Sequence, residues 1–194
     1  MQKNRLEAFS DGVIAIIITI MVLEIKVPHD TSVEALLNLA PVFFSYVLSF
    51  VYVAIYWNNH HHLFHSVQKV NGNVLWANMH LLFWLSLIPF ASGWMGENHF
   101  VSPTVTLYGF ILLMAAVAYY FLTVSLIKNH GHKSDIARAV GNKTKENISL
   151  ALYLLALPLS YWFPVISFVF YVIVAFIWLL PDRRIERVLS NREH

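Results

Sequence analysis

The stretch that decides the fold is RLEAFSDGVIAIIITIMVLEIKVP, at residues 5–28. Only 12 uncharged residues separate Asp11 from Glu24 in it, whereas a lipid-facing helix needs about 20 apolar residues. Ionised side chains near the hydrocarbon are costly unless they meet partners or water. We therefore expect this helix to be buried among other helices or to line a water-filled pathway, and to be the functional element of the chain.

The composition is that of an integral membrane protein. Apolar residues make up 58% of the 194 residues and charged residues 12%, against about 45–50% and 25% in soluble proteins. The absence of cysteine excludes disulfides, thiolate catalysis and cysteine metal sites. Arg5, Glu7 and Asp11 interrupt the start of the first segment, and no small-x-small cleavage site follows before Lys26. We expect the segment to be retained rather than removed as a signal peptide.

Apolar runs bounded by charged or turn-forming residues predict an all-α membrane protein with one transmembrane domain over residues 1–194. The six predicted spans lie near residues 6–27, 36–58, 73–95, 103–127, 147–163 and 164–181. The last two are predicted to be a tight pair of short helices joined around residues 160–164, because no charge occurs from Asn147 to Pro181. Ser102 is predicted to cap the fourth helix, with Pro103 at its first position, and Pro89 and Pro158 are expected to bend their spans.

The basic residues predict the orientation. Six spans place Lys26 alone on one face and the other 12 basic residues on the opposite face, which contains both termini. Those 12 are Lys3, Arg5, Lys69, Lys128, Lys133, Arg138, Lys143, Lys145, Arg183, Arg184, Arg187 and Arg192. Because basic loops stay in the cytoplasm, both termini are predicted to be cytoplasmic. The basic C-terminal tail fits this topology signal better than a dedicated lipid-binding role.

The first helix has two different faces. Arg5, Phe9, Gly12, Ile16, Ile20 and Leu23 share one face, with Thr19 beside them, at helical spacings of three and four. Asp11 lies roughly 140° from Ile16 around the helix, so the two cannot face the same neighbour. One face is free to line a pore while the other docks inside the subunit. There are simpler alternatives to a functional role for these residues. The isoleucine stripe could pack as an ordinary helix face, and Asp11 could form a structural hydrogen bond.

Several motifs resemble one membrane family. R-x-x-x-F-S-D, made by Arg5, Phe9, Ser10 and Asp11, is similar to the signature of the transmembrane-protein-175 family of potassium channels. The further matches are Trp57-x-x-His60 followed by Leu63-Phe64, Asn78 in the third span, and Pro89-Phe90. The motifs cover the first three helices, and the size and the number of helices match over the whole chain.

The resemblance implies a function. It implies a six-helix subunit that assembles as a homotetramer in the cell membrane, with the first helix lining a central pore. It implies passive conduction of potassium in modest preference to sodium through an apolar constriction. By register from the F-S-D motif, Ile16, Ile20 and Leu23 would form this constriction and Thr19 would lie beside the ion. The expected partners are membrane lipid and permeant monovalent cations, with no cofactor, enzymatic activity or nucleic-acid binding.

A polar cluster is expected behind the pore helix. The signature residues Arg5, Phe9, Ser10 and Asp11 form one part of it. We predict contact among Asp11, His60 and Asn78, with Arg5 as a further member. No metal site is expected at His60, His61, His62 and His65, because consecutive histidines point in different directions and no acidic residue lies nearby in sequence.

Two other classes of function stay open at this point. A secondary transporter needs a midplane site built from broken helices or paired ionisable groups, and the spans contain no central acid and no internal repeat. A membrane enzyme needs a nucleophile with its base, or a metal site. The transporter is the stronger alternative. It predicts saturable flux coupled to a second solute, whereas a pore predicts single-channel current steps.

Overall fold

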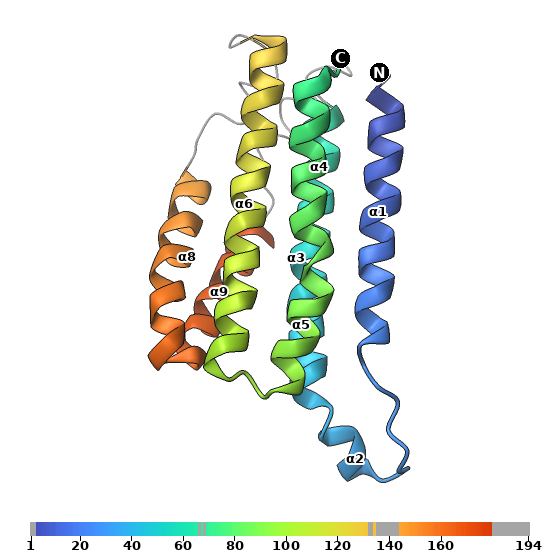
Figure 1. Cartoon of the computed structure of the whole chain (residues 1–194), viewed down its shortest axis with the longest axis vertical. Coiled ribbons are helices and arrows are strands. Elements are labelled where there is room, and N and C mark those ends of the chain that lie inside the picture. The colour runs from blue at the N-terminus through green and yellow to red at the C-terminus, as the bar shows by residue number, and fades with distance from the viewer. Residues whose placement is uncertain (1–2, 66, 68, 132–133, 135–143, 180–194) are drawn as a thin grey trace.

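The computed structural model describes residues 3–65, 67, 69–131, 134 and 144–179, and their regular structure is helical. The helices are α1 (Lys3–Leu23), α2 (Val33–Leu37), α3 (Ala40–His65), α4 (Gly72–Ser86), α5 (Ile88–Glu97), α6 (Ser102–His130), α8 (Thr144–Trp162) and α9 (Pro164–Leu179). Apart from the short α2, they run along the long axis of the molecule, with α5 continuing the line of α4 (Figure 1).

Helix α6 lies at the centre of the bundle and α1 lies at its edge. Helix α6 packs against α4, α5, α8 and α9, whereas α1 packs against α3, α4 and α5 (Figure 1). Glycine allows one close approach in the core, since a side chain at Gly109 of α6 would collide with the Tyr171 hydroxyl of α9. The position of α1 leaves one of its faces without a neighbour in the subunit.

The bundle has two distinct ends. At the N-terminal end, Asn129 of α6 accepts a hydrogen bond from Asn71 at 2.8 Å and donates one to the Lys69 carbonyl at 2.9 Å. At the opposite end, here called the α2 end, Lys26 forms an ion pair with Glu97. Helix α2 lies beyond the bundle at this end (Figure 1). The loop between α3 and α4 therefore lies at the N-terminal end, and the loop that follows α1 lies at the α2 end.

Four helical stretches are long and apolar enough to cross a membrane. They are Lys3–Leu23, Ala40–His65, Gly72–Glu97 (α4 with α5) and Ser102–His130, and they correspond to the first four predicted spans. Helices α8 and α9 occupy the fifth and sixth predicted segments, and α9 is apolar but has 16 residues. The turn between them falls at Phe163, within the predicted 160–164 corner.

Several predicted boundaries were wrong. Helix α3 begins at Ala40 and ends at His65, instead of covering 36–58. Residues 33–37 form α2 separately, and the histidine run continues α3, because histidine is compatible with helical backbone. The third predicted span is found as Gly72–Glu97, and its helix is interrupted at Leu87, in keeping with the bend expected at Pro89, which lies in the first turn of α5. Proline lacks a backbone N–H, and the first N–H groups of a helix have no partner within the helix, so Pro89 costs α5 no hydrogen bond at this position.

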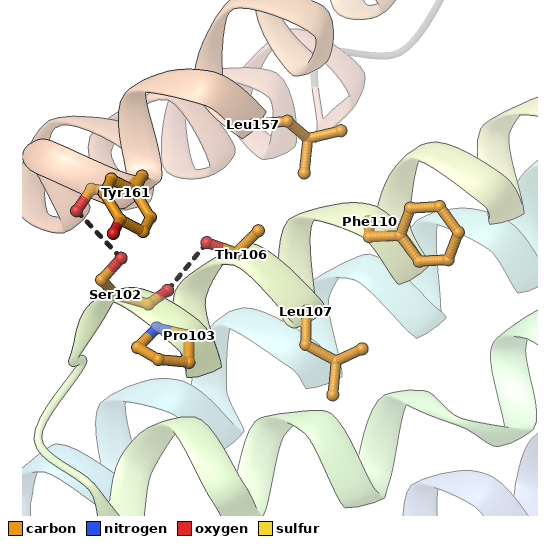
Figure 2. Close-up of a pocket in the computed structure, with 7 residues that line it drawn as sticks. All are labelled: Ser102, Pro103, Thr106, Leu107, Phe110, Leu157 and Tyr161. Carbon is orange, nitrogen blue, oxygen red and sulfur yellow. Dashed lines mark hydrogen bonds between the residues drawn. The ribbon is translucent and has the colours of Figure 1, made fainter.

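The predicted cap of the fourth helix is a further correction. Val101 is the N-cap residue of α6 and Ser102 is already helical. The Ser102 hydroxyl donates instead to the Tyr161 carbonyl at the end of α8, at 3.1 Å, and Thr106 donates to the Ser102 carbonyl at 2.8 Å (Figure 2). Ser102 therefore ties α6 to α8 at the α2 end. The groove beside these residues is lined also by Leu107, Phe110 and Leu157, and none of its lining side chains is an acid, a histidine, a lysine or an arginine.

The described basic residues follow the predicted division between the two ends. Lys3, Arg5, Lys69, Lys128 and Lys145 belong to segments at the N-terminal end, and Lys26 belongs to the α2 end (Figure 1). The remaining predicted members lie outside the described residues: Lys133, Arg138, Lys143, Arg183, Arg184, Arg187 and Arg192. Most of the 128–146 loop and the basic tail lie outside them too.

Candidate functional site: the first helix and its polar network

The buried face of α1 carries the residues that attach it to the bundle. They are Leu6, Ser10, Ile14, Ile17 and Met21, at spacings of four, four, three and four, which is one helical face. They pack against α3, α4 and α5. This packing fixes the rotation of α1 about its own axis, and so determines which residues the opposite face presents.

The exposed face of α1 is the face that the sequence predicted for the pore. Phe9 is 48% exposed, Ile16 58%, Ile20 42% and Leu23 77%, and Arg5, Gly12 and Thr19 are exposed too. Packing within its own subunit, the simpler alternative, therefore does not account for this isoleucine and leucine stripe. It is an apolar surface available to lipid, to a second subunit or to a pore.

Thr19 is the polar side chain next to this stripe. Its hydroxyl oxygen lies 2.9 Å from the Ile16 carbonyl and 3.2 Å from the Ala15 carbonyl, to which it donates. The single hydroxyl proton is used by the helix backbone, so the oxygen lone pairs remain as acceptors. Thr19 is thus able to offer an oxygen to a cation without rearrangement of its helix.

A buried polar network joins α1 to α4 and α3. The Ser10 hydroxyl donates to the Leu6 carbonyl at 2.9 Å and accepts a hydrogen bond from Asn78 Nδ2 at 2.9 Å. The other side of the amide, Asn78 Oδ1, lies 2.8 Å from His60 Nε2. Because an amide oxygen only accepts, His60 carries its proton on Nε2 in this arrangement. All three side chains are fully buried, and the network fixes α1 against its two neighbours.

Asp11 takes a different partner from the one predicted. Its carboxylate accepts a hydrogen bond from Trp57 Nε1 of α3 at 3.0 Å, while the bond to Asn78 comes from Ser10. Ser10 and Asp11 are about 100° apart on the helix, so only Ser10 faces the His60 and Asn78 pair. Arg5, included in the predicted cluster, lies on the exposed face of α1 instead.

The histidines lie in different surroundings. His60 is buried and stacks on Phe64, with ring centroids 4.4 Å apart. His61 Nδ1 lies 3.5 Å from Glu7 Oε1, forming a second contact between α3 and α1. Among the residues that the structure describes, no group of three or more histidine and acidic side chains is arranged to hold a metal ion.

Sequence reasoning missed the role of Trp57. The residue was noted only as part of a motif, although its indole N–H is the hydrogen-bond donor to Asp11. The available signal was position: Trp57 lies one turn before His60 and His61, and an indole N–H on a membrane helix commonly finds a hydrogen-bond acceptor. With an acid on the neighbouring helix, that partner was identifiable in principle.

Comparison with known proteins identifies the family. A family model described as the endosomal/lysosomal potassium channel TMEM175 matches residues 5–89, which contain α1 and the whole Ser10, His60 and Asn78 network. A Chryseobacterium protein named as a potassium channel is 54% identical over 191 residues, which is 98% of this chain and 100% of that protein. The chain belongs to the TMEM175 family. This confirms the resemblance seen in the F-S-D motif.

Other TMEM175 relatives extend the match to structure. The crystal structure of a lysosomal potassium-selective channel TMEM175 homolog from Chamaesiphon minutus has a TM-score of 0.78 and 29% sequence identity, and the match covers 92% of this chain and 96% of that one. The human protein, named as an endosomal/lysosomal proton channel TMEM175, is 35% identical over 103 residues, which is 47% of this chain and 20% of the human one. The fold is thus shared over nearly the whole chain with a bacterial TMEM175 protein.

Proposed function

We propose that this TMEM175 chain is one subunit of a homotetrameric potassium channel in the cell membrane, with the exposed face of α1 lining the pore. One observation carries the proposal. The stripe of Phe9, Ile16, Ile20 and Leu23 is exposed, although the helix that carries it is fixed in rotation by a packed face and a buried polar network. A helix held this firmly presents the same surface in every subunit.

A single subunit does not enclose a pore with one such helix. Closed rotational symmetry is the usual arrangement of identical chains, and it brings the four copies of α1 around one axis. The potassium-channel names of the bacterial relatives, from Chryseobacterium and Chamaesiphon, support the permeant ion. The channel is expected to need no cofactor and to perform no enzymatic reaction.

The proposed filter works by dehydration. Rings of Ile16, Ile20 and Leu23 offer no oxygen ligands, so they gate by dewetting and reject strongly hydrated ions, as hydrophobic constrictions do. Potassium releases its water more readily than sodium, which gives a modest preference for potassium. Thr19 supplies the one side-chain oxygen beside this stripe. No central ionisable pair is required, which distinguishes this mechanism from a secondary transporter.

The test is a reversal-potential measurement on purified protein in planar bilayers, with potassium and sodium gradients opposed. Wild type is compared with Ile16→Asn on the pore face and with the matched control Ile173→Asn, an exposed isoleucine of α9. We expect unitary currents that favour potassium in wild type and in the control. Ile16→Asn is expected to conduct with weaker selectivity, because the amide hydrates the constriction.

Other outcomes would contradict the proposal. Equal changes of selectivity in Ile16→Asn and Ile173→Asn would exclude α1 as the filter. An electrically silent wild type with saturable, coupled tracer uptake would identify a transporter. A strictly monomeric protein that still conducts would exclude the tetrameric pore.

The proposed orientation, with cytoplasmic termini, has its own test. Because the chain contains no cysteine, a single substitution provides a unique label. Thr31→Cys lies at the α2 end and Asn4→Cys at the N-terminal end, and both positions are exposed. A membrane-impermeant maleimide added to intact cells is expected to label Thr31→Cys and to leave Asn4→Cys unlabelled until the cells are opened. The reverse pattern would overturn the orientation.

A further inference from the structure

The two ends of the bundle carry opposite charge. At the α2 end, four carboxylates (Glu24, Asp30, Glu34 and Glu97) face one ammonium group (Lys26), which gives 1 − 4 = −3. At the N-terminal end, the described residues are Lys3, Arg5, Lys69, Lys128, Lys145, Glu7, Asp11 and Glu146, which give 5 − 3 = +2. A cation that approaches from the α2 end therefore meets a negative surface.

Local contacts at the α2 end stabilise the charged forms of Lys26 and Asp30 at neutral pH. The hydrogen bond to Glu97, together with the charge of Glu97, raises the pKa of Lys26, so this ammonium group stays protonated. The hydroxyl and backbone N–H of Ser32 both donate to Asp30 and lower the pKa of its carboxyl group. Lys26 and Asp30 therefore both stay charged at neutral pH.

Glu24 lies at the α2 end of α1. It follows Leu23, which ends α1 and is the most exposed residue of the apolar stripe. Glu24 is exposed, and its side chain lies against Gly93 of α5, where an added Cβ atom would be 3.1 Å from Glu24 Oε2. Lys26 directs its hydrogen bond to Glu97. The carboxylate of Glu24 thus lies at the α2 end of α1, on the side of the helix that faces α5.

We infer that Glu24 attracts cations to the α2 end of the pore and sets the rate at which they enter from that side. The inference rests on the proposed function, since it needs four copies of α1 around one axis. Four copies of one carboxylate then form a ring at the pore mouth, as rings of acidic side chains do in other cation channels. Such a ring raises the local cation concentration and the rate of entrance.

The size of the effect follows from Coulomb's law with screening. For four charges at roughly 10 Å from the axis in water, removal of the ring is expected to lower the inward conductance about three- to fivefold at low salt, where the Debye length exceeds 20 Å. At 1 M salt the Debye length is about 3 Å, and the same change is expected to alter the conductance by less than about 1.5-fold. The salt dependence separates an electrostatic role from a structural one.

The experiment is single-channel recording in excised patches of known orientation, in symmetric KCl at about 0.02 M and 1 M. Glu24→Gln removes the charge, and Glu24→Asp keeps it. Glu34→Gln is the matched control, because it removes the same charge at the same end but on α2. We expect a loss of potassium conductance from the α2 side at low salt in Glu24→Gln, little change in Glu24→Asp and Glu34→Gln, and similar conductance in all four proteins at 1 M.

Wild type alone provides a second test, which needs no variant to fold. At about 0.02 M KCl its current should be larger when potassium enters from the α2 side, and this rectification should disappear at 1 M. Symmetric wild-type currents at low salt would overturn the inference. So would equal losses in Glu24→Gln and Glu34→Gln, or a loss in Glu24→Gln that persists at 1 M. A wild type without potassium current would instead contradict the proposed function itself.

Discussion

The two faces of α1 are both largely apolar, yet one is buried in the bundle and the other is exposed. Ile16 is 58% exposed and Ile17, the next residue, is 4% exposed. Both faces consist mainly of isoleucine and other apolar residues, so hydrophobicity does not distinguish them. The polar residues do: Ser10 lies on the buried face and bonds to Asn78, while Thr19 lies on the exposed face and bonds only to its own helix. In a membrane helix, the few polar groups determine which face the bundle binds.

The largest difference between the two faces is expected when the same substitution is placed on each of them. Ile17→Asn puts an amide among apolar side chains, where it loses packing and lacks a partner. We expect a loss of about 3–5 kcal/mol in subunit stability. Ile16→Asn is expected to cost less than about 1 kcal/mol. The measurement is the thermal unfolding midpoint of each protein in detergent. If both variants were destabilised equally, Ile16 would have to be packed inside the subunit.

The second-largest loss of stability is expected when the buried polar network is broken. Asn78→Ala removes the partner of both Ser10 and His60, so His60 Nε2 loses its hydrogen bond and Ser10 keeps only its bond to the Leu6 carbonyl. We expect a loss of about 1–2 kcal/mol in stability, since hydrogen bonds between membrane helices are individually modest. Ser10→Ala removes one of the two bonds and serves as the graded control, with about half the loss. Equal losses in both variants would mean that the His60 bond contributes nothing.

The sequence determined the faces of α1 better than it determined their contacts. Helical periodicity placed Ile16, Ile20 and Leu23 on one face, because periodicity reflects the geometry of a regular helix. The structure leaves that face exposed. The predicted contact between His60 and Asn78 is confirmed. The partner of Asn78 on α1 was wrong, since Ser10 and Asp11 are adjacent and only the packing of α1 decides which one faces α4. The cap at Ser102 was missed because its hydroxyl bonds to α8, a contact that local sequence does not contain.

The contact between Asp11 and Trp57 lies at the border between the two faces. Trp57→Phe keeps the aromatic ring and removes the N–H that donates to Asp11. We expect a loss of about 0.5–1 kcal/mol in stability. Asp11→Ala, which removes the acceptor, is expected to impair assembly or opening as well, because α1, the proposed pore helix, loses one of its hydrogen bonds to α3. The measurements are the unfolding midpoint and the open probability in bilayers. An unchanged channel in Asp11→Ala would refute this role.

The smallest expected effect tests the single hydroxyl on the pore face. Thr19→Val keeps the shape and the β-branch but removes the oxygen, so neither helix packing nor the width of the constriction should change. We expect the potassium-to-sodium permeability ratio to fall about twofold, which corresponds to about 0.4 kcal/mol. Thr19→Ser retains the hydroxyl and should keep the wild-type ratio. If Thr19→Val also keeps that ratio while Ile16→Asn lowers it, then ions are selected by dehydration in the apolar ring alone, and the two faces of α1 differ only in what they pack against.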